Sequence, residues 1–265
     1  MTPHIPSSQV LLFFGVLCSL WCAEYIFFAN FQKNKLQRTG SNLLFILTAL
    51  PIQLGLSLVV VMVSTWCSTH NWGMLALLSN PDRLWAKYLL GFLFLDLMDY
   101  LYHVLMHKTG IFWQFHQVHH TDDVVDVSTT LREHPGETFI RVSFLVLFVF
   151  LSGAPIGLLI LRQTIQTISN LIAHTQLRLP AKMERFLGFI LVTPHIHSIH
   201  HHDVLPYTDS NYGDVLSIWD RMFGTYKELN KNEICHGLDV ISPDQASCFK
   251  KLIKIPFSLK KDSVS

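Results

Sequence analysis

Long apolar runs alternate with short polar segments along the first part of the chain. Three of these runs, residues 9–30, 43–66 and 84–106, are each long enough to cross the hydrocarbon core of a bilayer as a helix. The first run lacks the basic leader and the small-residue cleavage site of a signal peptide. The second contains Pro51 and Gly55, which membrane helices tolerate. The pattern predicts three membrane spans.

A fourth apolar region, residues 139–174, is interrupted by the segment Gly153–Pro155. Because Gly and Pro commonly mark turns, we expect a helical hairpin there rather than one long span. A hairpin also returns His174 to the side of the membrane where the third run ends. At 1.5 Å per residue the first arm is only about 20 Å long, so it should penetrate rather than cross. Arg162 in the second arm should face protein or water, since charge is costly in hydrocarbon.

Composition supports a membrane protein. Half of the 265 residues are apolar, 15% are charged, and the mean hydropathy is +0.33, whereas about 25% of a soluble domain is charged. The net charge of +1 argues against a nucleic-acid partner. Lys33, Lys35 and Arg38 form a predicted polar loop after the first run, and the positive-inside rule places such a loop in the cytoplasm.

Histidines supply the candidate chemistry, because the chain holds fifteen of them and most lie in two stretches. Three motifs stand out, one H-x-x-x-H and two H-x-x-H-H, each just outside an apolar run. Their members are His103 and His107, then His116, His119 and His120, then His197, His200 and His201. Spacings of three and four residues place imidazoles on one face of a helix. Eight imidazoles exceed the four ligands of one zinc ion and suit two metals with open positions. Iron, zinc, copper and nickel all remain candidates.

Other polar residues lie close to these motifs. Asn170 precedes His174 by one helical turn, so the pair could complete the site as an imidazole and a weaker amide ligand. Asp99, with Asp96 one turn before it, lies inside an apolar run and is expected to accept a ring N–H from a ligand histidine. His134 is expected to be an outer partner or an extra ligand.

For the remaining candidates the sequence favours less specific roles. His195 and His202, which flank the third motif, are expected to support ligands or face solvent. Asp220 is expected to be structural, pairing with Arg221 or with a ligand histidine. A solvated face is favoured for most of the other nearby carboxylates, although each could support a ligand. These are Asp122, Asp123, Asp126, Glu133, Glu137 and Asp214.

Longer motifs surround the histidines. They are D-x-x-x-H-x-x-x-H at 99–107, F-W-x-F-H-x-V-H-H at 112–120, T-x-L-R-x-H-P-x-E at 129–137, T-P-x-x-H-x-x-H-H at 193–201, and N-Y-G-x-x-L-x-I-W-D-R-x-F-G-T-Y at 211–226. In these motifs the chain resembles the fatty acid hydroxylase/sterol desaturase superfamily of membrane di-iron oxygenases, over roughly residues 84–228.

The resemblance implies a metal site and a reaction. It implies two iron ions, with zinc as an alternative in the isolated protein, O2 as oxidant, and electrons from a separate cytochrome b5, ferredoxin or reductase. The implied substrate is a lipid of the sterol, fatty acyl or alkylglycerol class, hydroxylated or desaturated at a C–H bond. The implied ligands are His103, His107, His116, His119, His120, His174, His197, His200 and His201. Asp99, His134 and Asn170 are further candidate site residues.

The sequence therefore predicts an all-α fold, an integral membrane bundle of about three spans and one hairpin with a cytoplasmic metal-binding cap. We expect membrane helices in residues 1–83, a catalytic domain in 84–230 and a tail in 231–265. A membrane protein that binds or transports metal without catalysis is the alternative. A zinc hydrolase is disfavoured because no H-E-x-x-H motif is present.

Overall fold

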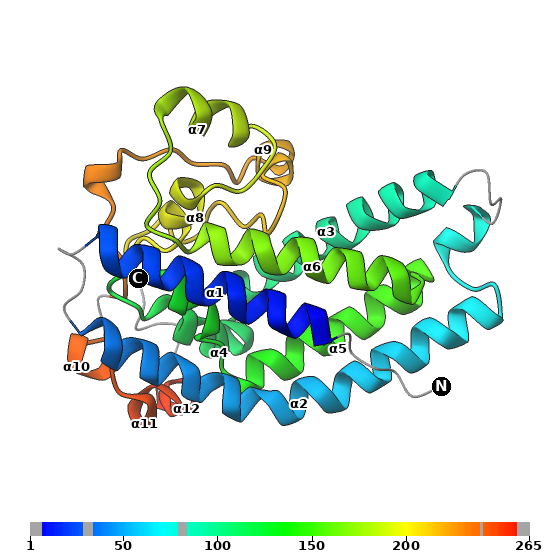
Figure 1. Ribbon diagram of the computed structural model, residues 1–265, viewed down its shortest axis with the longest axis horizontal. Coiled ribbons are helices and arrows are strands. Elements are labelled where there is room, and N and C mark those ends of the chain that lie inside the picture. Colours follow the sequence, from blue (N-terminus) through cyan, green and yellow to red (C-terminus); the bar gives the residue numbers. More distant parts are fainter. Residues whose placement is uncertain (1–6, 29–33, 79–83, 239–240, 259–265) are drawn as a thin grey trace.

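The protein is a bundle of long helices with a cap of short ones at one end (Figure 1). The computed structural model describes residues 7–28, 34–78, 84–238 and 241–258. The long helices are α1 (Ser7–Phe27), α2 (Lys35–Thr69), α3 (Leu84–Lys108), α5 (Pro135–Ser152) and α6 (Ile156–Ala173). The short ones of the cap are α4 (Gly110–His120), η4 (Val127–Leu131), α7 (Ala181–Leu187), α8 (Pro194–His200), α9 (Ile218–Phe223), η5 (Lys231–Glu233), α10 (Pro243–Ala246), α11 (Phe249–Leu252) and α12 (Ile255–Ser258). A further short helix, η2 (Met74–Leu78), lies at the opposite end, between α2 and α3. Among the described residues the only β-structure is two isolated bridges, so the predicted all-α membrane bundle is confirmed.

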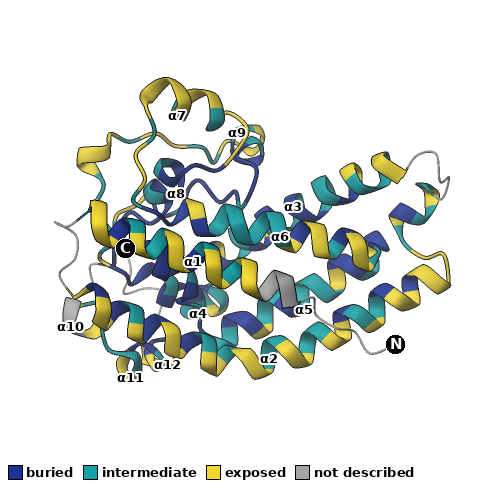
Figure 2. Ribbon diagram, in the orientation of Figure 1, coloured by how far each residue is buried: buried dark blue, intermediate teal, exposed yellow. Residues whose placement is uncertain are grey.

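Four of the long helices, α2, α3, α5 and α6, are long and apolar enough to cross a membrane. They run roughly along the long axis of the molecule, and α4 and α8 lie near the same end of them (Figure 1). Leu47 and Met62 on α2 are 65% and 69% exposed, whereas Asp122 and Arg132 in the cap are fully buried. Figure 2 shows this contrast between the outer faces of the bundle and the interior of the cap. Large exposed apolar faces are typical of membrane contact.

The predicted hairpin is confirmed, with its turn at Gly153. This residue is left-handed at φ 68°, and a Cβ there would lie 2.0 Å from the Trp72 carbonyl oxygen, so glycine is required. The predicted short first arm is wrong, because α5 begins at Pro135 and has 18 residues. At 1.5 Å per residue that is about 27 Å, nearly enough to cross the hydrocarbon core. The helix begins early because His134 caps it and proline suits its first position.

The polar segment before α2 also differs from the prediction. Lys35 and Arg38 lie in the first turn of α2 rather than in a loop, and both are buried. Lys35 Nζ donates to Glu24 at 2.8 Å and Arg38 Nη2 donates to Asp126 at 2.7 Å. Buried cations need such partners, and no local pattern reveals them. Because Lys35 and Arg38 are buried ion-pair partners, neither of them is a loop charge that can indicate the cytoplasmic side. The third predicted loop charge, Lys33, lies outside the described residues.

The three predicted segments, 1–83, 84–230 and 231–265, stay a prediction. Buried polar contacts cross the boundary at residue 83. Besides the pair between Arg38 and Asp126, Asn42 Nδ2 donates to Ser128 Oγ at 3.1 Å and Arg132 Nε donates to Asn42 Oδ1 at 2.8 Å. These contacts tie α2 to the segment around η4, which supports the site described next.

Candidate metal centre

Four elements bring the predicted histidines together. The end of α3 carries His103 and His107, and α4 carries the second motif at its own end. The third motif lies on α8, which begins where the Thr193 hydroxyl accepts from the Ile196 N–H and proline occupies the first position. His174 is the C-cap of α6. The hairpin turn at the far end thus returns α6, and with it His174, to the end where α3 terminates.

The nine predicted ligands form two groups, and within each group one nitrogen per ring lies within 4.8 Å of every other. The five-histidine group is His103, His107, His116, His120 and His200. The four-histidine group is His119, His174, His197 and His201. The groups adjoin, because the ring centroids of His120 and His201 are 4.5 Å apart. The described chain contains no further such group of three or more potential ligands.

Partners outside the groups fix which nitrogen of several rings carries the proton. In the five-histidine group, Nδ1 of His103 and His200 lies 2.8 and 2.7 Å from the carbonyl oxygens of Tyr212 and Ser210. His116 Nδ1 lies 2.6 Å from a Glu137 oxygen. These oxygens accept hydrogen bonds, so each Nδ1 must donate a proton. The Nε2 atoms of the three neutral rings therefore present lone pairs.

The four-histidine group has two rings of the same tautomer. His119 Nδ1 donates to the Arg132 carbonyl at 3.2 Å, and His174 Nδ1 donates to the Asn170 carbonyl at 2.8 Å. Their Nε2 atoms lie 3.1 Å apart. Burial lowers the pKa of His174 to about 4 and that of His119 well below its usual value. Two neutral rings thus face each other through lone pairs.

This lone-pair geometry fits bound cations. In the other group, His103 and His116 Nε2 are also 3.1 Å apart, and burial lowers the pKa of His116 to about 3. His200 Nε2 is buried without a hydrogen-bond partner. Lone pairs that face one another without a proton repel, whereas a metal ion between them would satisfy all of them. The donor set, nitrogen from neutral imidazole, suits iron and other first-row transition metals.

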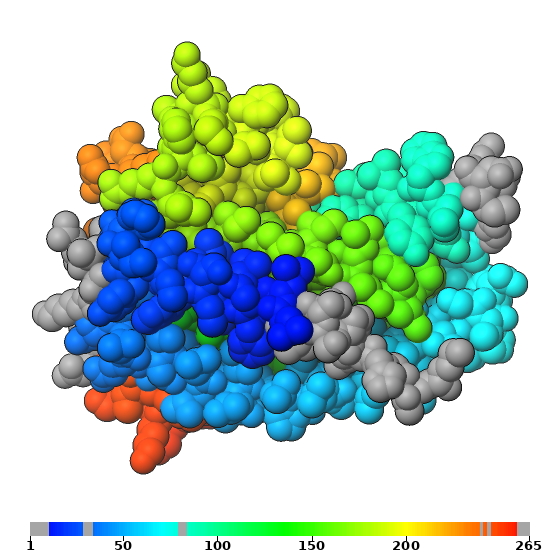
Figure 3. Space-filling model, viewed as in Figure 1, coloured from blue at the N-terminus to red at the C-terminus, as the bar shows by residue number. Residues whose placement is uncertain are grey.

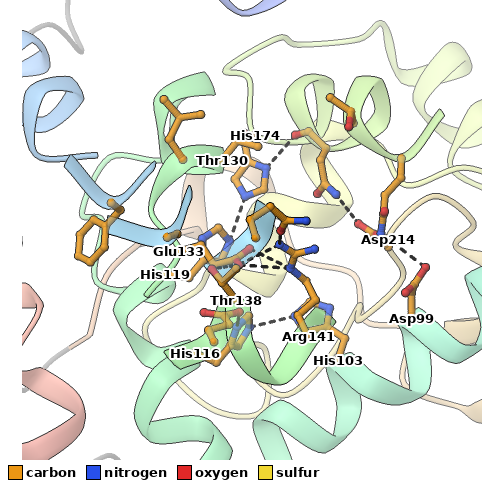
Figure 4. A pocket seen from close by; sticks show the side chains of 18 of the residues that line it. Asp99, His103, His116, His119, Thr130, Glu133, Thr138, Arg141, His174 and Asp214 are labelled. Atoms are coloured by element: carbon orange, nitrogen blue, oxygen red, sulfur yellow. Dashed lines mark hydrogen bonds and ion pairs between the residues drawn. The ribbon is translucent and has the colours of Figure 1, made fainter. Parts of the chain in front are cut away.

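A cavity of about 410 Å³ opens onto both groups. His103, His116, His119, His174 and His197 line it. Figure 4 shows four of these rings together with several of the polar side chains that line the same cavity. Its apolar lining, the apolar wall, comes mainly from α1, α2 and η4, whereas its polar lining comes mainly from α5 and α6. Such a cavity can hold part of an elongated apolar molecule next to the histidines.

Asp99 and Asp96 bind other partners than ligand histidines. Asp99 lines the cavity and pairs with Arg162, which donates from Nε at 3.1 Å and from Nη2. Asp96 accepts from the Trp219 indole N–H at 2.8 Å. Neither carboxylate accepts the hydrogen bond from a ligand histidine that the sequence had suggested. Asp99 instead serves as the counter-ion of Arg162, a buried charge on the facing helix.

His134 and Asn170 are placed beside the site in different ways. His134 caps α5, with Nδ1 accepting from the Gly136 N–H at 2.9 Å and Nε2 lying 3.2 Å from the Ile253 carbonyl. It belongs to neither histidine group. Asn170 lines the cavity, but its amide nitrogen donates to Asp214 at 2.6 Å, and only its backbone carbonyl holds His174.

Several carboxylates expected on a solvated face are buried. Glu137 is buried and contacts His116. Its position at the end of the T-x-L-R-x-H-P-x-E motif is the one sequence feature that could have indicated this role. Asp122 and Asp126 are fully buried and pair with Arg38, and Asp122 also pairs with Arg132. Long-range basic partners make this burial possible, and sequence spacing does not reveal them.

Asp220 has a structural role as predicted, but it bonds neither Arg221 nor a histidine. It accepts hydrogen bonds from the backbone N–H groups of Tyr212 and Gly213 at 2.7 and 2.8 Å. Because the Tyr212 carbonyl holds His103, Asp220 supports a ligand through the backbone rather than by touching it. Asp209, which the sequence did not single out, lies 3.3 Å from Nδ1 of His107.

His195 and His202 stand outside both groups. His202 Nδ1 accepts from the Val204 N–H at 3.0 Å, and His202 Nε2 lies 3.1 Å from the Glu233 carbonyl. His202 thus organises the loop after α8. His236, which the sequence placed outside any motif, has Nε2 at 2.7 Å from the hydroxyl of Ser198 on α8.

Comparisons with known proteins agree with this geometry. An alkylglycerol monooxygenase of Danio rerio is 32% identical over 173 residues, which are 64% of this chain and 36% of that protein. An alkylglycerol monooxygenase of Caenorhabditis elegans is 31% identical over 59% of this chain and 30% of its own length. The ornithine lipid hydroxylase OlsE of Rhizobium tropici is 29% identical over 55% of this chain and 44% of its own length. The chain thus spans less than half the length of these relatives.

No solved structure matches the chain. Residues 88–225 match the family described as fatty acid hydroxylase, and this segment contains all nine grouped histidines. It also lies within the predicted segment 84–230. Because the match covers more than half of the 265 residues, the chain belongs to the fatty acid hydroxylase family.

Proposed function

We propose that the protein is a membrane di-iron oxygenase that hydroxylates or desaturates a C–H bond of a lipid. One observation carries the proposal, namely two adjoining groups of neutral imidazoles that open onto one cavity with an apolar wall. The nine grouped histidines are the proposed ligands. The names of the similar proteins, alkylglycerol monooxygenase and ornithine lipid hydroxylase, support a lipid as the substrate.

Iron held by these rings would supply the redox chemistry that makes O2 able to oxidise an unactivated C–H bond. In a hydroxylation, one oxygen atom of O2 enters the lipid and the other leaves as water, with two electrons and two protons from outside. The family resemblance implies that the electrons come from a separate donor protein.

The protein's own residues position and shield the reaction. Ring orientation is fixed by partners at Nδ1, which leaves Nε2 of each of these rings free to hold iron. The partners are Glu137 and the carbonyls of Tyr212, Ser210, Arg132 and Asn170. The apolar wall holds the hydrocarbon part of the lipid and excludes water from it.

We further propose that the cap faces the cytoplasm. The cap end carries several exposed basic residues, namely Lys108, Arg178, Lys182, Arg185, Lys227, Lys231, Lys250 and Lys251. At the opposite end, the described loops between α2 and η2 and between α5 and α6 carry none, and the first turn of α3 carries Lys87. An excess of Lys and Arg near the ends of membrane helices favours the cytoplasmic side. A cysteine introduced at Lys231 should react with an impermeant thiol reagent only from the cytoplasm.

The decisive experiment is lipid mass spectrometry of cells with and without the protein, grown under 18O2. Hydroxylation predicts a lipid that gains one 18O label, and desaturation predicts one that loses two hydrogens, each only when the protein is present. A His119→Ala variant should abolish the product. A purified protein that holds metal yet changes no lipid would support the alternative of a non-catalytic metal-binding protein.

A further inference from the structure

Two short helices of the cap, α7 and α9, lie on one side of the helical bundle, displaced sideways from α6 (Figure 1). Figure 3 shows α7 standing out from the molecular surface on that side. The most exposed apolar side chains of α7, of residues 188–191 and of α9 form what we call the α7–α9 patch. They are Met183, Phe186, Phe189, Ile190, Met222 and Phe223. Phe186 is 77% exposed and Met222 is 68% exposed.

Hydrogen bonds hold this patch in a fixed position. The Gly188 carbonyl accepts from the Ser217 hydroxyl at 2.8 Å and from Arg221 Nη2 at 3.0 Å. The Ser217 N–H donates to the Ile190 carbonyl at 2.9 Å. These bonds tie the turn after α7 to the beginning of α9. The outward direction of Phe189 and Ile190 is therefore built into the fold and is not the fraying of a loose end.

The helix α9 is attached to the flank of α3, which is long and apolar enough to cross a membrane. Trp219 on α9 donates to Asp96 on α3 at 2.8 Å. Phe223, the last residue of α9, stacks on Tyr100 of α3 with ring centroids 5.4 Å apart. Because α3 ends at Lys108, these two contacts lie about 18 and 12 Å before the end of the helix, at 1.5 Å per residue.

These contacts place the patch beside the bilayer. With 25 residues, α3 is about 37 Å long. The hydrocarbon core is about 30 Å thick, so at most about 7 Å of α3 can extend beyond it at the cap end. The contacts at Asp96 and Tyr100 lie deeper than that. The patch therefore lies at the boundary between the hydrocarbon core and the headgroups, on the cap side of the membrane.

Positive charge lies next to the apolar side chains on α7. Lys182 and Arg185 are exposed and three residues apart, so they share one side of the helix. Met183 and Phe186 form the adjacent row with the same spacing. The acidic residue of α7, Glu184, accepts a hydrogen bond from the hydroxyl that caps α8. An apolar row beside a basic row is typical of helices that lie in the plane of a membrane interface.

We propose that the α7–α9 patch is a membrane anchor, which inserts into the lipid leaflet at the cap end and binds anionic lipid through Lys182 and Arg185. The apolar side chains enter the edge of the hydrocarbon core, and the two cations contact headgroup phosphates. The inference goes beyond the proposed function, since it does not depend on the reaction. It does bear on the metal centre, because α8 with the third histidine motif follows directly after the anchor.

Other occupants of the patch fit less well. Bulk water would leave a cluster of large apolar side chains solvated, which is unusual for a soluble surface. A soluble protein is excluded from the depth at which α9 contacts α3. A second copy of the chain could reach that depth, but its own patch would bring the same positive charges to the contact, and like charges repel.

Photo-crosslinking tests the depth of the patch. The full chain in lipid nanodiscs carries p-benzoylphenylalanine in place of Phe186 or, as a control, in place of the exposed Lys231 in η5. Mass spectrometry should find lipid adducts from the position of Phe186 and none above background from that of Lys231. Equal amounts of lipid adduct at the two positions, or a crosslink from the position of Phe186 to a second copy of the chain, would overturn the anchor.

Headgroup selectivity tests the basic row. One Lys or Arg near the membrane surface favours anionic lipid about fivefold. In nanodiscs with equal amounts of phosphatidylglycerol and phosphatidylcholine, crosslinks from the position of Phe186 should therefore favour phosphatidylglycerol about 5- to 25-fold.

The double variant Lys182→Gln/Arg185→Gln should lose this preference. Lys250→Gln/Lys251→Gln makes the same change in charge on α11 and should retain it. A preference that survives in the first variant, or that disappears equally in both, would overturn the assignment of Lys182 and Arg185.

Discussion

The two histidine groups differ in how their rings are held. In the five-histidine group, two rings have carboxylate partners, since Glu137 contacts His116 at 2.6 Å and Asp209 contacts His107 at 3.3 Å. A carboxylate adds negative charge behind the imidazole and raises its basicity as a ligand. That group therefore depends on side chains that substitution can remove.

In the four-histidine group, the ring partners outside the group are backbone carbonyls. The Arg132 carbonyl holds His119, and the Asn170 carbonyl holds His174. A backbone acceptor remains when its side chain is replaced, so this group depends on the path of the chain. Both groups use backbone carbonyls, but carboxylate side chains support only the five-histidine group. The ring partners of the four-histidine group depend on the fold around η4 and the end of α6.

The largest expected effect is loss of a metal ligand from either group. His200→Ala or His119→Ala should each lower the metal content from about two ions per chain to about one, because each group has its own ligand set. Both variants should lose lipid oxidation. Inductively coupled plasma mass spectrometry gives the metal content. His195→Ala, on the same helix as His200 but in neither group, should leave it unchanged, and full metal content in the two ligand variants would contradict the assignment.

The next effect tests the dependence of the four-histidine group on the fold. Asp122 is fully buried and lies 3.2 Å from Arg132 and 3.4 Å from Arg38. Asp122→Asn should lower the free energy of unfolding by about 3 kcal/mol, because it leaves buried guanidinium charge uncompensated. Metal should be lost first from the group that contains His119.

Thermal unfolding in detergent measures this loss. Asp123→Asn changes the exposed neighbour and should stay within about 0.5 kcal/mol of the unmodified protein. Equal effects of the two substitutions would show that the buried ion pairs do not support the group.

A smaller effect tests the carboxylate partners. Glu137→Ala should weaken metal binding to the five-histidine group about 10- to 100-fold, and Glu137→Gln should restore part of the loss because the amide oxygen still accepts from His116. Asp209→Asn should matter less, since Asp209 is partly exposed and its contact with His107 is longer. Competition with a chelator measures both affinities. Equal losses for Glu137→Ala and Asp209→Asn would contradict the ranking.

Sequence spacing predicted the ligands better than their partners. All nine predicted ligands fall in the two groups. Spacings of three and four residues keep the histidines of each motif near one another on a short helix, and α4 and α8 each contribute to both groups. His134, predicted as an outer partner or an extra ligand, bonds the backbone of its own helix, because a side chain at an N-cap turns back to the first turn. One turn later, Glu137 points to His116 instead.

Long-range partners could not be predicted. Asp209 is 102 residues from His107, and Arg38 is 88 residues from Asp126. Neither pair forms a local pattern, and each depends on which ends of the bundle meet. The predicted hairpin is confirmed because its signal is local, a glycine whose left-handed conformation suits a turn.

The smallest expected effect concerns Asn170. If its amide were a metal ligand, Asn170→Ala would remove metal from the four-histidine group. In the structure the amide is directed to Asp214, and His174 uses the Asn170 backbone carbonyl, which alanine retains. Alanine also favours the helix. We therefore expect unchanged metal content by mass spectrometry. A loss of metal equal to that of His174→Ala would return Asn170 to the ligand set and remove the distinction between backbone and side-chain support.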